Sequence, residues 1–164
     1  MKYSADAWTV EGDPILVDRT GGTLVAWAPA ALAVTTSASG AEYTLTAQKD
    51  AAAQDLIYQH QSVNAANAGA VAVEMGHAYS KLSFLATAGN GYTGAANLTQ
   101  VQITGGIYAT GTLNMVDGKV DPVGTATLTL AAGEKALVIP MAGQPTIAVT
   151  CTCLLYTSDA ADDM

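Results

Sequence analysis

The two histidines of the chain, His60 and His77, are the natural first candidates for acid–base chemistry. His77 follows Glu74 by three residues, and a carboxylate at that spacing would be a candidate to orient a general base. However, Gly76 separates the two side chains and no nucleophile is implied beside them. We therefore expect His77 to pack or hydrogen bond at the start of a strand and His60 to be solvated. The sequence predicts no catalytic residue and no enzyme.

Two cysteines flank Thr152 near the end of the chain. A Cys151–Cys153 pair alone is a weak metal signal, because tetrahedral zinc requires two further cysteine or histidine ligands. The acidic residues are scattered singly, which argues against a calcium loop or a glycosidase pair. We expect no metal site and no cofactor. The triplet that starts at Asn97 fits a glycosylation sequon, a pattern that is common by chance.

Aromatic residues recur along the chain and allow two interpretations. They would offer a sugar-stacking surface if several shared one face, but aromatic residues in predicted strands more often belong to the core or to cross-strand pairs. We favour the core. The residues are Trp8, Trp27, Tyr43, Tyr58, Tyr79, Tyr92 and Tyr108.

The composition excludes several classes of protein. Only 12% of the 164 residues are charged and 50% are hydrophobic, which is unlike a disordered tail or a coiled coil. The net charge of −8 makes a surface for nucleic acid improbable. No apolar run approaches the roughly 18 residues that cross a bilayer, and the first residues do not begin a signal peptide. The length suits one domain.

Short strand signals separated by turn residues predict an all-β fold. The expected strands are Tyr3–Val10, Pro14–Val17, Thr23–Ala28, Glu42–Ala47, Leu56–Gln59, Ala70–Met75, Tyr79–Thr87, Leu98–Thr104, Ile107–Met115, Thr125–Leu130, Ala136–Ile139 and Thr146–Cys151.

Alternation within these strands predicts which side chains face the core. In Thr125–Leu130 we expect the threonines to face water and the apolar residues to face inward, and Val71, Val73 and Met75 alternate in the same way. The Asp117-Gly118 dipeptide predicts a tight hairpin turn, as does Asn90-Gly91. Alanine-rich stretches at 30–33, 51–53 and 65–70 predict short helical turns.

The last residues differ in character from the rest of the chain. Cys153–Asp163 can be translated back into the adapter of a transposon-based sequencing library, so we interpret 153–164 as a non-native tail of a metagenomic fragment. Without it, 11 acidic and 6 basic residues remain, a net charge of −5. We expect one β-sandwich domain over 1–152.

A series of sequence blocks follows in order along the chain. The first comprises Tyr3, Trp8, Asp13-Pro14-Ile15 and Leu24–Pro29. These residues resemble the start of a domain of the fimbrillin family of type V pilins. Asp55–Tyr58 is similar to the family's DLLYA block, and Val71–Phe84 to its VxLxFxHALSKLxF block. Ala136–Pro140 resembles its LLVPQ strand. Together the blocks cover about residues 3–150.

The resemblance implies a transthyretin-like Greek-key β-sandwich that is incomplete at both ends. Fimbrillins are exported as lipoprotein precursors, trimmed by a protease, and polymerised on the outer cell surface by donor-strand exchange. We expect their lipid-bearing cysteine, signal peptide, trimmed strand, donor strand and second domain to have no counterpart in this chain. His77 and Lys81 match a motif that we interpret as structural, and we do not expect Arg19 to be the processing site. No functional residue is therefore assigned.

Two hypotheses follow. The first is a structural subunit or accessory protein of a bacterial fimbria used in adhesion. Its partners would be other fimbrial subunits, with no nucleic acid and with a membrane only through the lipid anchor of the precursor. The alternative is a non-polymerising cell-surface β-sandwich that binds carbohydrate or host protein.

Overall fold

The computed structural model describes residues 2–4, 7–9, 17–38, 40–67, 71–85, 87, 96–140 and 149–155, with side chains for 17–38, 40–66, 71–85, 87 and 99–140. The elements are β1 (Lys2–Ser4), β2 (Ala7–Thr9), β3 (Gly22–Ala28), β4 (Thr35–Ser37), β5 (Gly40–Thr46), β6 (Gln48–Lys49), the 3₁₀ turn η1 (Ala52–Gln54), β7 (Ile57–Val63), the 3₁₀ turn η2 (Ala65–Asn67), β8 (Gly76–His77), β9 (Ser80–Leu82), β10 (Ala96–Ile103), β11 (Thr110–Asn114), β12 (Val120–Val123), β13 (Leu128–Ala131), β14 (Ala136–Val138) and β15 (Val149–Leu155).

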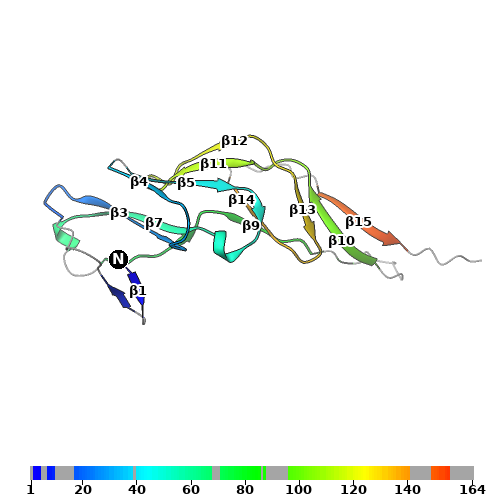
Figure 1. Ribbon diagram of the computed structural model, residues 1–164, viewed down its shortest axis with the longest axis horizontal. Coiled ribbons are helices and arrows are strands. Elements are labelled where there is room, and N and C mark those ends of the chain that lie inside the picture. Colours follow the sequence, from blue (N-terminus) through cyan, green and yellow to red (C-terminus); the bar gives the residue numbers. More distant parts are fainter. Residues whose placement is uncertain are drawn as a thin grey trace, which may run out of the picture.

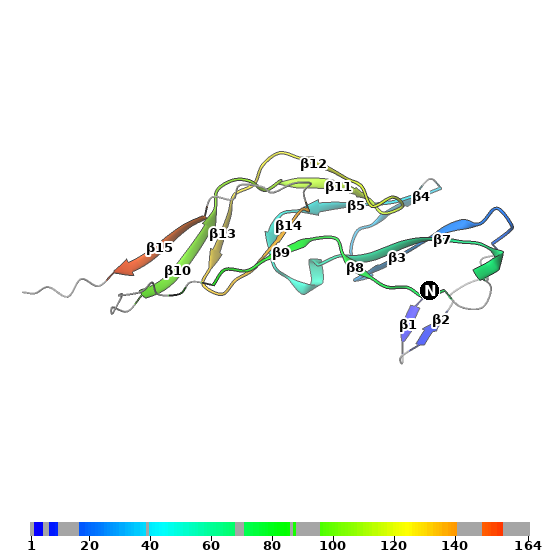
Figure 2. The same ribbon diagram turned by 180° about the vertical axis from the view of Figure 1, so that it is seen from behind.

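All pairing among these strands is antiparallel, which confirms the all-β prediction. The sheets have the orders β12-β11-β5-β4, β3-β7-β8, β6-β14-β9 and β13-β10-β15, and β1 and β2 form a separate hairpin. The molecule is elongated, with the β3-β7-β8 sheet toward one end and the β13-β10-β15 sheet at the other (Figures 1 and 2). The arrangement is that of an all-β sandwich.

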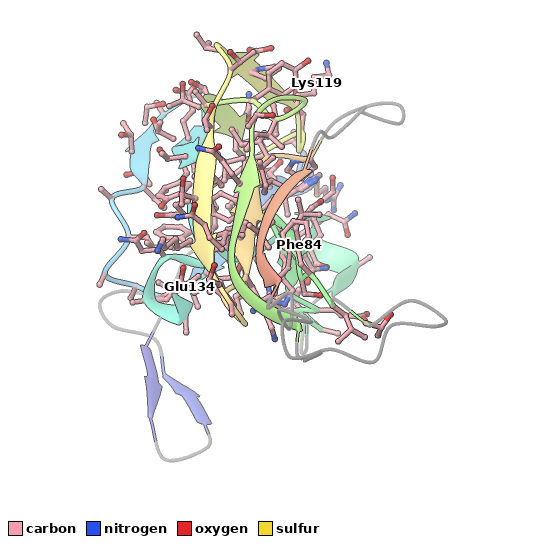
Figure 3. The ribbon with its side chains drawn as sticks, turned by 90° about the vertical axis from the view of Figure 1, so that its right-hand side faces the viewer. Phe84, Lys119 and Glu134 are labelled. Atoms are coloured by element: carbon pink, nitrogen blue, oxygen red, sulfur yellow. The ribbon has the colours of Figure 1, made fainter. Side chains whose placement is uncertain are left out.

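Two apolar cores lie along this long axis. The first lies between β5 and β11 on one side and β3, β7 and the residues just before β9 on the other, and the second lies beneath β10 and β13. Phe84, labelled in Figure 3, packs against the second core. The buried residues of the first core are Ala41, Leu45, Leu56, Ala78, Tyr79, Leu113, Met115, Leu137 and Ile139. Those of the second are Ala47, Val101, Ile103, Ile107, Leu130, Ala136 and Val138.

Strand β14 joins the two cores. Leu137 and Ile139 belong to the first core, whereas Ala136 and Val138 belong to the second. Successive side chains of a strand point to opposite faces, so a strand that lies between two cores must be apolar at every position. The continuous apolar run from Ala136 to Ile139 therefore reflects burial on both faces.

Tyr79 stabilises the point at which one strand leaves its sheet. β5 pairs with β11 up to Thr46, and the chain then enters a different sheet as β6. The backbone N–H of Thr46 donates a hydrogen bond to the phenol oxygen of Tyr79 at 3.1 Å. A backbone N–H is an obligatory donor, and the buried Tyr79 side chain supplies its acceptor where β4 no longer pairs with β5.

The hairpin predicted at Asp117-Gly118 is present, but its loop is longer than the dipeptide alone predicts. β11 pairs with β12, and the N–H of Asn114 donates to the carbonyl of Lys119 at 2.8 Å around the four residues 115–118. The longer loop lets Met115 remain fully buried, while Gly118 adopts a φ of 73°. Asn90-Gly91 lies outside the described residues.

Two strand predictions were wrong in the described residues. Residues 71–75 form no strand, and Val71 and Val73 are each 38% exposed. The N–H of Glu74 donates to the side chain of Gln59 on β7, so pairing with β7 begins only at Gly76. The predicted single strand Tyr3–Val10 is instead the β1-β2 hairpin.

Other predictions hold. Thr125, Thr127 and Thr129 are exposed, while Ala126, Leu128 and Leu130 contribute to the second core. Two of the three alanine-rich stretches, 51–53 and 65–70, overlap the 3₁₀ turns η1 and η2.

Candidate functional site: an uncharged groove between edge strands

The edges of the sheets differ in how they resist pairing with another chain. An exposed edge strand offers unpaired backbone groups, and proline or charged residues commonly block such pairing. Proline and aspartate lie on β12 (Asp121 and Pro122), and lysines lie on β6 (Lys49) and β9 (Lys81). In contrast, β3 has seven residues with neither proline nor charge. Among the described strands β3 pairs only with β7, so its other edge is open.

A groove of about 390 Å³ runs beside this open edge, between β3 and the β4-β5 hairpin. On one wall, alternate residues of β3 line it, namely Thr23, Val25 and Trp27. The other wall consists of Thr36, Ser37, Ala38, Gly40, Ala41 and Val116. None of the described residues that line the groove is charged. A spacing of two residues is the repeat of a β-strand, so the groove matches an extended chain lying along β3.

The β3-β7 pairing orients the groove residues. Trp27 lies opposite Tyr58 and Val25 opposite His60, so these side chains share the inner face of the sheet. Val25, Trp27 and Tyr58 pack against the first core. The floor of the groove is therefore held by core packing, while its edge stays open.

His77 has a different partner from the one its sequence neighbours indicate. Its Nδ1 lies 2.9 Å from Oδ2 of Asp55, whose side chain is only 13% exposed, while His77 is 66% exposed. Glu74 is exposed and its backbone N–H bonds Gln59. Oδ1 of Asp55 is buried and has no hydrogen-bond partner within the described part of the chain. The pair lies where β8 pairs with β7, and its contacts hold these two strands together.

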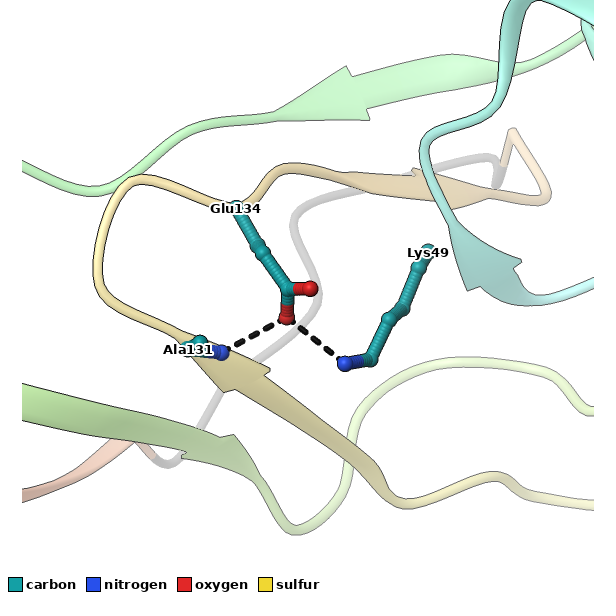
Figure 4. A network of polar contacts seen from close by, with 3 residues as sticks. All are labelled: Lys49, Ala131 and Glu134. Carbon is teal, nitrogen blue, oxygen red and sulfur yellow. Dashed lines mark hydrogen bonds and ion pairs between the residues drawn. The ribbon is translucent and has the colours of Figure 1, made fainter.

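Two further ion pairs anchor the segment that leads to η1. Lys81 Nζ lies 2.6 Å from Asp50 Oδ2. Figure 4 shows the Glu134 carboxylate between Lys49 Nζ and the N–H of Ala131, each at 2.7 Å. The Lys49 ammonium, followed by the Ala131 amide, holds the pKa of Glu134 below its usual range. These ion pairs connect neighbouring segments of the sheets. None of their residues lines the groove.

The aromatic residues follow the core interpretation wherever the structure describes them. Trp27, Tyr43, Tyr58 and Tyr108 pack against the first core, and Tyr79 is buried in it. Trp8 and Tyr92 lie outside the described side chains. His60 is exposed, as expected, and its ring stacks on Tyr58 with centroids 6.4 Å apart. A shared aromatic surface for sugars is not found among these residues.

The remaining sequence candidates add no site. No group of three or more metal-ligating side chains occurs in the described ranges, and the side chains of Cys151, Cys153 and Asn97 lie outside them. Within the same ranges the structure contains no helix that is long and apolar enough to cross a membrane. Arg19 lies in the turn before β3, where the side chain of Asp18 accepts the N–H of Thr20 at 2.8 Å.

Sequence reasoning missed the groove and Asp55. The alternation of Thr23, Val25 and Trp27 is visible in the sequence, but the open edge beside them depends on which strand pairs with β3. Asp55 is marked in the sequence only as the first residue of the block similar to DLLYA, before Leu56, which the structure buries fully.

The comparisons with known proteins agree with this architecture. A family model described as fimbrillin-like matches residues 1–162. A search of curated proteins finds no match. Since the family model spans nearly the whole chain and the strands form an all-β sandwich, this chain belongs to the fimbrillin-like family.

Proposed function

We propose that this chain is a structural subunit or accessory protein of a bacterial surface fimbria, assembled by donor-strand exchange and used in adhesion. Membership of the fimbrillin-like family supports a fimbrial subunit role, a location at the cell surface and association with other fimbrial subunits. It is a family of structural subunits, which agrees with the expectation that the chain is not an enzyme. The proposal adds a transthyretin-like fold of type V pilins and export of the full precursor as a lipoprotein.

The observation that carries the proposal is the uncharged groove beside the open edge of β3. A strand from a neighbouring subunit placed there would satisfy the unpaired backbone groups of β3 and cover Val25 and Trp27. A contact of one subunit's strand with another subunit's groove is heterologous, so repetition gives an open fibre rather than a closed ring. This is the geometry that a fimbrial shaft requires.

A single lysine on the edge tests the proposal. Thr23 is exposed and lines the groove, so Thr23→Lys introduces a charge that resists strand pairing without removing core packing. The matched control is Thr112→Lys, because Thr112 is also exposed but lies on β11, where it pairs with Thr44 of β5 on one side and with Asp121 of β12 on the other.

With subunits of the same fimbria present, we expect the wild-type chain and Thr112→Lys to associate in size-exclusion chromatography, and Thr23→Lys to elute as a monomer. Both variants should keep the wild-type free energy of unfolding to within about 0.5 kcal/mol. A wild-type chain that remains a stable monomer, with subunits of the same fimbria present, would contradict assembly through this edge. It would favour the non-polymerising surface module instead.

A further inference from the structure

The hydrogen-bond ladder between β7 and β8 ends early, because only the first two residues of β7 pair with β8 (Figure 2). Beside this short ladder the N–H of Ala78 donates to the carbonyl of Leu56 at 2.8 Å. Hydrogen-bonded pairs occur at every second position of an antiparallel ladder, so Tyr58 and Gly76 form the next one. Every second residue of β7 from Tyr58 onward therefore directs its N–H and C=O toward the β8 side.

The next hydrogen-bonded pair in the same register would be His60 and Glu74, with the N–H of Glu74 donating to the carbonyl of His60. In the structure this N–H donates instead to the side-chain oxygen of Gln59. The side-chain nitrogen of Gln59 in turn donates to Gln61 Oε1 at 3.2 Å. The Gln59 carboxamide thus takes the donor that would continue the ladder. Among the described strands, none pairs with β7 beyond Tyr58 on this side.

Residues 71–75 have the composition of a strand that fits this edge of β7. They contain neither proline nor glycine, and their apolar residues alternate. In the continued register Val71 lies opposite Val63, so a side chain that is 38% exposed gains an apolar cross-strand neighbour. Glu74 lies opposite His60, which is exposed, so pairing leaves the carboxylate in water. The continued ladder therefore buries no charge.

We propose that residues 71–75 form a strap that closes onto the open edge of β7, and that the Gln59 carboxamide holds the strap off. In the closed state β8 extends from Val71 to His77. The edge then offered to another chain carries the charge of Glu74, and charged edge strands resist pairing. The strap thus protects the β7 side of the sheet. This inference goes beyond the proposed function, because it concerns one chain alone and β3 keeps its open edge in both states.

Gln59→Ala tests the strap by amide hydrogen exchange. If the strap closes, the amide of Ala72 should exchange about two- to tenfold more slowly in the variant, because it gains one backbone hydrogen bond to β7. The amide of Glu74 should exchange no faster, because the carbonyl of His60 replaces the lost side chain. Exchange at Ala72 that is unchanged or faster would overturn the proposal, and faster exchange at Glu74 would then show that Gln59 is its only partner.

Gln102→Ala is the matched control for this measurement. The Gln102 side chain also donates to a neighbouring side chain, Thr129 Oγ1 at 3.5 Å, but it lies on β10 in a different sheet. This variant should leave hydrogen exchange in the strap unchanged. A change of the same size as in Gln59→Ala would show that the effect is not local to β7, which would overturn the proposal.

A disulfide tests the register and needs no change at Gln59. In a chain whose own cysteines are replaced by serine, Gln61→Cys is combined with Val73→Cys. The continued register makes these a directly opposite, non-hydrogen-bonded pair with Cα atoms about 4.5 Å apart, which a disulfide can span. Gln61→Cys with Ala72→Cys is the control, because adjacent residues point to opposite faces. We expect the first pair to oxidise at least about tenfold faster. Equal or slower oxidation would overturn the closed state in this register and would leave assembly through β3 untouched.

Discussion

Asp55 and His77 show how a pair of residues that resembles catalytic machinery can serve the fold. Asp55 is nearly buried, and Nδ1 of the His77 imidazole lies 2.9 Å from its Oδ2. The neighbouring backbone is also hydrogen bonded, because the N–H of Ala78 donates to the carbonyl of Leu56. The pair therefore fixes β8 against β7.

Removing His77 should leave a nearly buried carboxylate without its partner. We expect His77→Ala to lower the free energy of unfolding by about 1–3 kcal/mol, measured by urea denaturation. Adding Asp55→Asn should recover part of the loss, because a neutral amide costs less to bury than a charge. His60→Ala, at an exposed histidine, is the control and should have a smaller effect. A His77→Ala variant as stable as wild type would show that solvent already satisfies Asp55.

Tyr79 gives the fold a dependence on alkaline pH. Burial, the largest cause, raises the pKa of Tyr79 from 10.0 to about 12. The folded state thus keeps the phenol neutral at a pH where the unfolded chain ionises. The stabilisation is complete below about pH 10 and is lost as the pH rises toward 12. A shift of about two units corresponds to about 2–3 kcal/mol.

Tyr79→Phe checks this prediction. Below pH 10 it should cost about 0.5–1.5 kcal/mol, because the N–H of Thr46 loses its acceptor. Between pH 10 and 12 the variant should lose less stability than wild type, as measured by denaturation across that range. If the free energy of unfolding falls equally steeply with pH in the two proteins, groups other than Tyr79 account for the loss of stability at alkaline pH.

Among the strands, β14 contributes most clearly to both cores. Leu137 is 1% exposed and Leu85 is 90% exposed, which makes a matched pair for one substitution. Leu137→Ala should lower the free energy of unfolding by about 2–5 kcal/mol, because the cavity lies in the interior. Leu85→Ala should change it by less than about 0.5 kcal/mol. Similar losses in both variants would contradict the position of β14 between two cores.

The strands also show why the alternation of apolar residues wrongly predicted a strand at 71–75. Val71, Val73 and Met75 alternate as well as Ala126, Leu128 and Leu130 do. Of these residues, Leu128 and Leu130 lie on β13, which pairs with β10, whereas no described strand pairs with residues 71–75. A pattern of period two predicts a strand, but the backbone needs a neighbour with free hydrogen-bonding groups to form one.

At the scale of the whole molecule, the boundary predicted at Thr152 stays a prediction. β15 continues to Leu155, and its last residues lie opposite Ala96, Asn97 and Leu98 of β10. The part before the boundary pairs with Val101 and Ile103, the β10 residues of the second core.

Two deletions test this boundary. A chain that ends at Thr152 should keep the wild-type melting temperature, because the pairs it loses lie beyond the core residues of β10. A chain that ends at residue 148 should melt clearly lower, because β10 then loses all its partners in β15. A large loss already in the first deletion would show that residues 153–164 contribute to the fold.

The sequence by itself determined the all-β class, the hairpin at Asp117-Gly118, the core positions of β13 and the family to which the ordered blocks belong. These properties are local, because strand alternation and turn chemistry are set by residues close together in the chain. Only the tertiary structure decided that Asp55 is the partner of His77, that β14 is buried on both faces, and that β3 is an open edge beside a groove. Each of these depends on which distant segments lie side by side, and a local pattern carries no record of that.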